Sequence, residues 1–235
     1  MLEVRDIHVS YGAVEAVRGV SLVVEEGSIV ALMGANGAGK SSTLRCITGQ
    51  VPAARGEVAW NRMVLSGMTA ARIARLGIAC APEGRGIFGD LTVLENLRLG
   101  AHRLRGSRRH GRNLDLVYEF FPVLRERRDQ IAHTLSGGEQ QMMVIGRALM
   151  SEPRLLLLDE PSLGLAPKVV DQVYAIVADI CRQLRLGALI VEQDASLALS
   201  VASTGYVLRS GQVAIHGPCD DLLADRTVRE SYLGA

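Results

Sequence analysis

A glycine-rich segment that ends in lysine and serine has the spacing of a phosphate-binding loop. It reads Gly34-Ala-Asn-Gly-Ala-Gly-Lys-Ser41 and matches Gly-x-x-x-x-Gly-Lys-Ser. Glycines let a backbone take positive φ angles and point successive N–H groups at an anion. The Lys40 ammonium would neutralise β- and γ-phosphates, and the Ser41 hydroxyl would bind Mg²⁺. The alternative is a glycine-rich turn that happens to end in Lys-Ser.

The segments on either side of the loop favour the phosphate-binding interpretation. Residues 28–33 form a short apolar run typical of a buried strand, and residues 41–47 are typical of a helix that Gly49 ends. A helix that starts at the loop adds the partial positive charge of its N-terminus. We therefore predict that the nucleotide contacts Gly34, Ala35, Asn36, Gly37, Ala38, Gly39, Lys40, Ser41 and Ser42.

An acidic pair ends an apolar run further along the chain. Asp159 and Glu160 follow four leucines at 155–158, a pattern typical of a buried central strand. Ligands of open α/β sheets bind at the carboxyl ends of the strands. Asp159 is thus placed to hold a metal, and Glu160 to polarise an attacking water as a general base. The two carboxylates could instead cap the next helix, but the phosphate loop favours the catalytic interpretation.

A second anion-binding turn lies at Leu135-Ser-Gly-Gly-Glu-Gln140. Ser136, Gly137 and Gly138 are predicted to open a helix that runs through Met150. The free N–H groups of its first turn and the Ser136 hydroxyl would form another phosphate cradle. An ordinary helix N-cap followed by two glycines is the alternative.

The turn stands just ahead of Arg147-Ala-Leu and the acidic strand. With these segments in this order, the chain resembles the ATP-binding cassette (ABC) family of transport ATPases. The resemblance covers almost the whole chain. The resemblance implies an α/β fold, a P-loop NTPase core with an N-terminal antiparallel β subdomain and an inserted α-helical subdomain. Within a single domain, 1–235, it assigns 1–86 and 154–235 to the nucleotide-binding core with its β subdomain. It assigns 87–153 to the helical subdomain that carries the second turn.

The resemblance also implies how ATP is bound. In this family an aromatic side chain near the N-terminus stacks on adenine, and Tyr11 occupies that place. Such stacking contributes roughly 1–3 kcal/mol by analogy with nucleic-acid bases. A core tyrosine is the alternative. The family sandwiches ATP between the phosphate loop of one subunit and the Ser-Gly-Gly turn of its partner, so that ATP closes a dimer and hydrolysis opens it.

Two residues depart from the usual family pattern. Glu83 stands where glutamine is usual, and Gln193 stands where histidine is usual. Glu83 still offers an oxygen near Mg²⁺, and Gln193 can still bridge to the γ-phosphate or to water. A glutamine does not carry a proton as charge, so a mechanism that needs an imidazolium is unsuited to this chain.

Together with Pro161-Ser-Leu-Gly-Leu-Ala-Pro167 and Val191-Glu-Gln193, these departures resemble the smaller ATPase of high-affinity branched-chain amino acid importers. That branch implies a second ABC ATPase that is non-identical, two integral-membrane permease subunits and, indirectly, a solute-binding protein. The location implied is the cytoplasmic face of the plasma membrane. The alternatives are a urea or short-amide importer, a soluble ABC protein of DNA repair or translation, and a nucleotide-dependent binding module without turnover.

The surrounding pattern predicts the elements that position these residues. Strands are expected at 3–9, 20–24 and 56–60, and helices at 69–76 and from the Thr92–Glu95 capping box to residue 102. After Pro153 strands at 155–159 and 188–193 alternate with helices at 168–186 and 195–202, which predicts a parallel sheet covered by helices. The family resemblance makes residues 83–99 the candidate docking surface for a permease.

Composition limits the classes of protein to which the chain could belong. The chain has 235 residues, 48% of them hydrophobic, and a net charge of +1 that favours neither nucleic acid nor a membrane surface. No apolar run approaches the roughly 20 residues that cross a bilayer, and the charged N-terminus is unlike a secretion signal. The cysteines lack metal-ligand spacing and are expected to be buried in a reducing compartment, without disulfides or a structural metal: Cys46, Cys80, Cys181 and Cys219.

Overall fold

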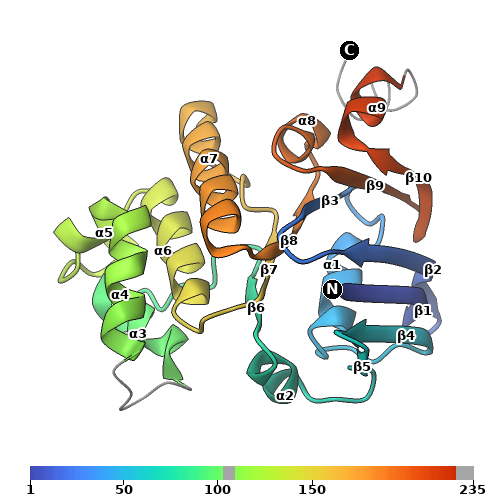
Figure 1. The fold of residues 1–235 in the computed structure, drawn as a ribbon, viewed down its shortest axis with the longest axis horizontal. Helices are drawn as coiled ribbons and strands as arrows, with labels where there is room; N and C mark the ends of the chain where they lie inside the picture. The colour runs from blue at the N-terminus through green and yellow to red at the C-terminus, as the bar shows by residue number, and fades with distance from the viewer. Residues whose placement is uncertain (103–108, 226–235) are drawn as a thin grey trace.

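An antiparallel sheet forms one side of the molecule in the computed structural model, which describes residues 1–102 and 109–225 (Figure 1). Its strand order is β2-β1-β4-β5, with bounds β1 Leu2–Tyr11, β2 Val14–Val24, β4 Arg55–Trp60 and β5 Met63–Val64. The predicted strands are present, but the second one begins at Val14 rather than Val20. Pairing with β1 along its whole length explains this extension, because Tyr11 pairs with Val14 across the hairpin.

A second, six-stranded sheet carries the acidic strand, in the order β10-β9-β3-β8-β7-β6. Its strands are β3 Ile29–Met33, β6 Ile78–Ala81, β7 Leu155–Asp159, β8 Gly187–Glu192, β9 Thr204–Arg209 and β10 Gln212–Pro218. Each neighbouring pair among β9, β3, β8, β7 and β6, taken in their order across the sheet, is parallel. Strand β10 pairs antiparallel with β9. The predicted parallel sheet is confirmed, whereas the β9–β10 hairpin was not predicted.

Helices cover the second sheet and extend into a lobe of their own. Figure 1 shows α3 to α6 grouped at one end, and α1 beside the antiparallel sheet at the other. The bounds are α1 Lys40–Ile47, α2 Ala70–Arg75, α3 Val93–Gly100, α4 Arg109–Phe120, α5 Pro122–Glu126, the short 3-10 helix Ala132–Thr134, α6 Gly137–Leu149, α7 Pro167–Leu184, α8 Ala195–Leu199 and α9 Cys219–Ala224. The predicted capping box at Thr92 is present.

The leucines of β7 explain how the acidic pair is fixed. Leu155 and Leu157 pack into the core shared with the antiparallel sheet, and Leu156 and Leu158 pack into the core shared with α6 and α7. All four are fully buried. Side chains of a strand alternate between its two faces, so a continuous apolar run is needed where both faces are covered. Burying each leucine contributes roughly 1.5–3 kcal/mol, which holds the end of the strand in place.

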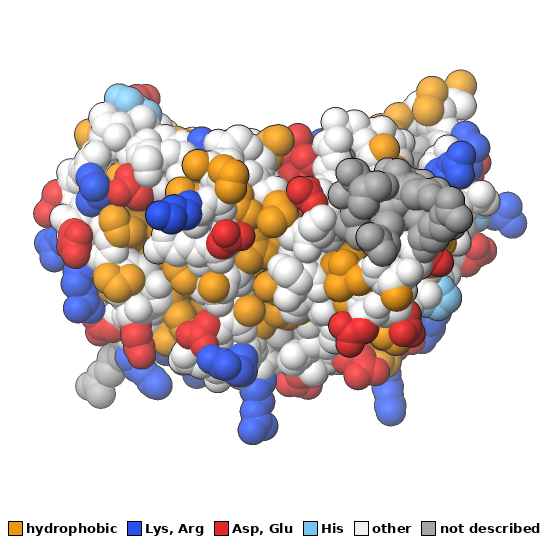
Figure 2. Space-filling view, turned by 90° about the horizontal axis from the view of Figure 1, so that it is seen from above, with side chains coloured by type: hydrophobic (Ala, Val, Ile, Leu, Met, Phe, Trp, Pro, Cys, Tyr) orange, Lys and Arg blue, Asp and Glu red, His pale blue; other side chains and the backbone are white. Residues whose placement is uncertain are grey.

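The predicted fold class is confirmed by this arrangement of sheets and helices, whereas the subdomain boundaries at 86/87 and 153/154 stay a prediction. Three cysteines are buried, but Cys80 is only partly buried. None of the helices in the described part of the chain combines the length and hydropathy needed to span a membrane. Figure 2 shows acidic and basic side chains interspersed around the rim of one face rather than separated by sign.

Candidate active site

The phosphate loop joins β3 to α1, as the sequence predicts. Residues 35–37 are exposed at its apex, and Gly39 precedes α1 in the left-handed region at φ 105°. A Cβ atom on Gly39 would lie 2.7 Å from the Ala16 carbonyl oxygen, and one on Gly34 would lie 2.5 Å from the Leu208 carbonyl oxygen. Backbone packing by itself therefore requires glycine at these two positions of the loop. Gly39 provides no side-chain cap for helix α1, so no capping side chain takes up the N–H groups of its first turn.

Lys40 points back into this loop and reaches the acidic strand. Its Nζ donates hydrogen bonds to the carbonyl oxygens of Gly34 at 2.8 Å and Ala35 at 3.3 Å. The same ammonium lies 3.2 Å from Glu160 Oε1, and both side chains are largely buried. The next residue, Ser41, donates from Oγ to Asp159 Oδ1 at 3.3 Å. The structure thus brings Lys40 and Ser41 together with two carboxylates that lie more than a hundred residues further along the sequence.

Strand pairing places Gln193 beside the acidic pair. Asp159 pairs with Val191 of β8, and the Glu160 N–H donates to the Val191 carbonyl oxygen at 2.9 Å. Gln193 follows directly after β8 and is exposed. Glu160 adopts a left-handed backbone at φ 47°. Such a conformation is disfavoured for a residue with a side chain and often occurs at functional sites.

The Asp159 carboxyl lies in an environment that favours its protonated form. Burial raises the pKa of Asp159 to about 6, and the negative charges of Glu83 and Glu160 act in the same direction. Glu83 is therefore close enough to act electrostatically on this carboxyl. The deprotonated, negatively charged form of Asp159 is therefore unfavourable here unless a cation balances its charge.

This environment predicts a pH-dependent loss of stability. Between pH 4 and 6 the folded chain keeps a proton on Asp159 that the unfolded chain releases, because its pKa is raised from 3.8 to about 6. The free energy of unfolding should therefore fall as pH rises through this window. Urea unfolding without metal or nucleotide should show a larger decrease for the wild type than for Asp159→Asn. An equal decrease in both proteins would contradict the assignment.

The Ser-Gly-Gly turn opens α6 as predicted, but its donors are not all free. The Ser136 N–H and hydroxyl both donate to Glu139 Oε2 at 2.9 Å, and the Ser136 Oγ accepts from the Glu139 N–H. This reciprocal capping box replaces the expected cluster of free groups at Ser136, because Glu139 stands one turn along the helix and reaches back. The N–H groups of Gly137 and Gly138 remain first-turn donors without an intrahelical acceptor.

The turn and the phosphate loop lie in different parts of the chain. In Figure 1, α6 belongs to the helical lobe and α1 lies beside the antiparallel sheet. Among the described interactions, no hydrogen bond or ion pair joins Ser136, Gly137 or Gly138 to the phosphate loop. The fold of one chain therefore assembles Lys40, Ser41, Asp159 and Glu160 but does not add the Ser-Gly-Gly turn to them.

Comparison with known proteins agrees with this geometry. The family described as "ABC transporter" matches residues 17–163, which include the phosphate loop, the Ser-Gly-Gly turn and the acidic pair. The chain belongs to the ABC transporter ATP-binding family. It is 44% identical to the high-affinity branched-chain amino acid transport ATP-binding protein BraG of Pseudomonas aeruginosa, over 100% of both proteins. The resemblance to the smaller ATPase of branched-chain amino acid importers is thereby confirmed.

The ABC ATPase is also similar to two further proteins. It is 30% identical to the transport ATP-binding protein BraF of the same organism, over 100% of this chain and 98% of that protein. The crystal structure of the ADP conformation of MJ1267, an ATP-binding cassette of an ABC transporter, matches with a TM-score of 0.88. That match covers 100% of this chain and 99% of the other, at 28% identity. Family membership implies ATP binding and a place in a transporter complex.

Tyr11 of this ABC ATPase stands at the tip of the β1–β2 hairpin. Its side chain is 41% exposed, which contradicts the alternative of a core tyrosine. The same hairpin reaches the phosphate loop, because Ala16 in β2 packs against Gly39. An exposed ring on an element that touches the loop is suited to stacking on adenine, and that role stays a prediction.

Glu192 is a buried carboxylate that was not among the site residues predicted from the sequence. It accepts hydrogen bonds from the Tyr174 hydroxyl at 2.7 Å, the Ser162 N–H at 3.0 Å and the Gln193 N–H at 3.2 Å. Burial raises the pKa of Glu192, whereas these donors act in the opposite direction. The side chain therefore ties the segment after Glu160 to the segment that carries Gln193. A glutamate that ends an otherwise apolar strand was the available signal, as it was for Asp159.

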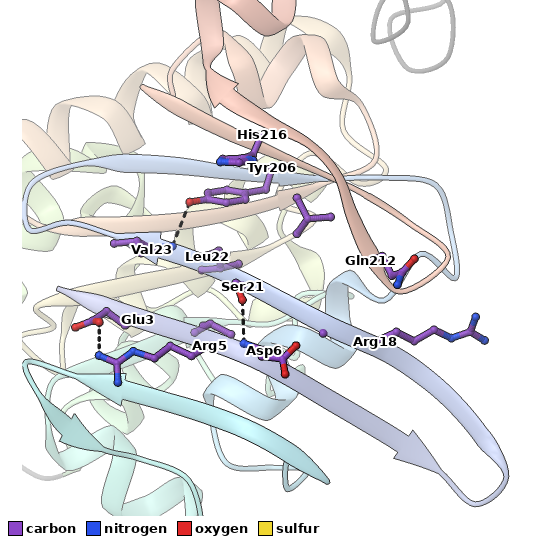
Figure 3. A pocket seen from close by; sticks show the side chains of 13 residues that line it. Glu3, Arg5, Asp6, Arg18, Ser21, Leu22, Val23, Tyr206, Gln212 and His216 are labelled. Atoms are coloured by element: carbon purple, nitrogen blue, oxygen red, sulfur yellow. Dashed lines mark hydrogen bonds and ion pairs between the residues drawn. The ribbon is translucent and has the colours of Figure 1, made fainter.

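A groove of about 820 Å³ lies elsewhere, between β2 and the β9–β10 hairpin (Figure 3). The Tyr206 hydroxyl there accepts a hydrogen bond from the Val23 N–H at 3.3 Å, and the Tyr206 ring stacks on His216. None of the residues that line the groove belongs to the predicted nucleotide site. The groove forms where the edges of two sheets diverge, apart from the predicted nucleotide site.

Proposed function

We propose that this ABC ATPase is the ATP-hydrolysing motor subunit of an importer for branched-chain amino acids. The observation that carries the hydrolytic part is the meeting of Lys40 and Ser41 with Asp159 and Glu160 at the end of β7. The full-length similarity to BraG supports the substrate class. The subunit would work at the cytoplasmic face of the plasma membrane with two permease subunits and, indirectly, a solute-binding protein.

In the proposed reaction, the phosphate loop binds the triphosphate and Glu160 activates water. Phosphate oxygens would take up the Lys40 ammonium now held by Gly34, Ala35 and Glu160. The Glu160 carboxylate would then accept a proton from the attacking water. Gln193, one residue past β8, would orient that water or the γ-phosphate through its amide, without changing its own charge.

The residues at this end of the sheet suit Mg²⁺. The Ser41 hydroxyl, the Asp159 carboxylate and the nearby Glu83 are hard oxygen donors, which Mg²⁺ prefers. No group of three His, Cys, Asp or Glu residues in the described ranges could hold a metal without help. Mg²⁺ usually binds through one or two protein groups together with substrate phosphates. A bound Mg²⁺ would supply positive charge to the phosphates and to Asp159.

A second ABC ATPase would complete the site. Because the chain keeps its Ser-Gly-Gly turn apart from its phosphate loop, we propose that Ser136, Gly137 and Gly138 bind the ATP of a partner subunit. For Ser136 to donate to a phosphate, its hydroxyl must leave Glu139 Oε2. The similarity to both BraG and BraF supports a non-identical partner.

Gene deletion in the native host tests the transport function. Loss of labelled leucine uptake, restored by the wild-type gene and not by Glu160→Gln, is expected. The complex purified through this subunit should contain a second ATPase and two permease subunits. Loss of urea or short-amide uptake with normal leucine uptake would assign the alternative importer. Purification without any membrane partner, with uptake unchanged, would favour a soluble ABC ATPase.

Phe88 marks the surface that we propose as the permease contact. Its ring is 52% exposed and lies beside a groove of about 450 Å³ lined also by Ile73, Cys80 and Leu99. Buried Asn96 fixes the segment, since its amide bonds both the N–H and the carbonyl oxygen of Phe88 at 3.0 Å. An exposed aromatic ring on a rigid backbone is suited to an interface, where such residues contribute most of the binding free energy.

Phe88→Ala should therefore weaken the complex while sparing the nucleotide site. We expect the subunit to dissociate from the permeases about tenfold or more readily, as measured by co-purification at decreasing concentration. Nucleotide affinity of the isolated chain should not change. Met63→Ala removes another large exposed apolar side chain, on strand β5 of the antiparallel sheet, and is the matched control. Equal retention of both variants in the complex would contradict the proposed surface.

A further inference from the structure

The guanidinium of Arg85 lies where three separate loops meet. Its Nη1 donates to Gln140 Oε1 at 3.0 Å, and its Nη2 donates to the Gly164 carbonyl oxygen at 3.4 Å. A Cβ atom on Gly137 would lie 2.9 Å from the same Nη2, so the guanidinium packs directly against the first residue of α6. One side chain of the loop after β6 thus contacts both the first turn of α6 and the segment that follows the acidic pair.

The backbone around Arg85 is held from the same helix. Arg85 adopts a left-handed conformation at φ 67°, between Gly84 at φ 69° and Gly86 at φ 48°. Such a conformation persists at a residue with a side chain when the surroundings determine it. The Arg147 Nη2 donates to the Gly86 carbonyl oxygen at 2.8 Å. Gln140 and Arg147 of α6 therefore hold the loop through its side chain and its backbone.

These contacts join groups that act on two different nucleotides if the proposed function is correct. Glu83, two residues before Arg85, acts electrostatically on Asp159 of the chain's own site. Gly137 belongs to the turn that would face the partner's ATP. Gly164 follows Glu160 by four residues and is also contacted by Arg85. A planar guanidinium can donate in several fixed directions at once, whereas a lysine ammonium is a single point charge.

We infer that Arg85 is a positioning residue, which couples the Glu83 loop to the placement of the Ser-Gly-Gly turn. It touches neither nucleotide in this scheme and acts by fixing Gly137, Gln140 and Gly164 relative to one another. Its loss should leave ATP binding by the phosphate loop unchanged and should slow hydrolysis in the assembled pair. This inference rests on the proposed function, in which the turn of one subunit completes the site of the other.

Kinetics of the purified transporter complex test this role. Arg85→Met and Arg85→Lys should lower kcat by about tenfold or more, the effect of losing one charge-assisted hydrogen bond. The Kd of a fluorescent ATP analogue for the isolated chain should stay at its wild-type value, and the melting temperature should fall by no more than about 2–4 °C. Arg62→Met is the matched control, because Arg62 is an exposed arginine with a left-handed backbone at φ 66°. It should keep the wild-type kcat.

A double-mutant cycle separates positioning from general structural support. If Arg85 acts through Gln140, the pair Arg85→Met and Gln140→Ala should lower kcat no further than Arg85→Met alone. Independent, additive losses would overturn the inference, as would a wild-type kcat in Arg85→Met. A parallel fall in melting temperature and ATP affinity would assign Arg85 a merely structural role. An inactive wild-type complex would instead count against the proposed function, so the two failures are distinguishable.

Discussion

Glu160→Gln is expected to reduce ATP turnover by roughly 10²–10⁴-fold, the usual contribution of a general base. Glutamine has nearly the same shape, so the hydrogen bond from the residue 160 N–H to the Val191 carbonyl oxygen should persist. An amide cannot accept the proton of water as a carboxylate does. ATP should bind and stay unhydrolysed, which would trap the closed pair of subunits. Phosphate release from the purified complex measures turnover, and size-exclusion chromatography with ATP–Mg²⁺ measures closure.

Glu152→Gln is the matched control for this experiment. Glu152 also has a left-handed backbone, at φ 53°, and it also pairs with a cation, since Arg109 Nη1 lies 3.4 Å from its Oε2. It lies in the loop between α6 and β7, outside the proposed site. Turnover should remain at the wild-type value. Wild-type turnover in Glu160→Gln would remove Glu160 from the role of base, whereas a loss in both variants would indicate a general structural effect.

Lys40→Ala should abolish tight nucleotide binding. The buried Lys40 ammonium makes hydrogen bonds within the loop that phosphate oxygens would replace. A hydrogen bond to a charged group contributes about 1.5–3 kcal/mol, so losing two of them corresponds to a decrease in affinity of about 100-fold or more. Equilibrium titration of the isolated chain with a fluorescent ATP analogue measures this decrease in affinity directly.

Two controls distinguish loss of binding from loss of folding. Lys168→Ala removes an exposed lysine in the first turn of α7 and should keep wild-type affinity. Lys40→Ala also leaves the largely buried Glu160 carboxylate without its ion pair, so the double variant Lys40→Ala, Glu160→Gln tests whether that charge unfolds the chain. Micromolar ATP affinity in a folded Lys40→Ala protein would contradict the assignment.

The sequence was sufficient where a function depends on residues that are adjacent in the chain. The phosphate loop is a contiguous segment between a strand and a helix, and local backbone geometry decides how it folds. The four leucines before Asp159 similarly predict a strand covered on both faces, because each face needs its own apolar side chains. The start of a helix at Ser136 was likewise predicted from the sequence, whereas its capping box with Glu139 was recognised only in the structure.

The C-terminal hairpin shows where local patterns fail. Strand β9 contains Gly205, and glycine weakens a strand pattern. In the structure a Cβ atom there would lie 2.6 Å from Leu222 Cδ1, so packing with α9 requires the glycine. Pairing with β3 makes this segment a strand. Such pairing depends on residues far away in the chain, and strand propensity is correspondingly dependent on context.

The contiguous motifs were by themselves sufficient to predict that this chain binds a nucleoside triphosphate and which segments are expected to hold it. Only the tertiary structure decided that Glu192 joins the segments after β7 and β8, and that Arg85 reaches both Gln140 and Gly164. Each of these contacts joins side chains and backbone from elements that become neighbours through packing. Hydrogen bonds act over about 3 Å, so residues far apart in sequence acquire such roles once the folded core has brought them within that range.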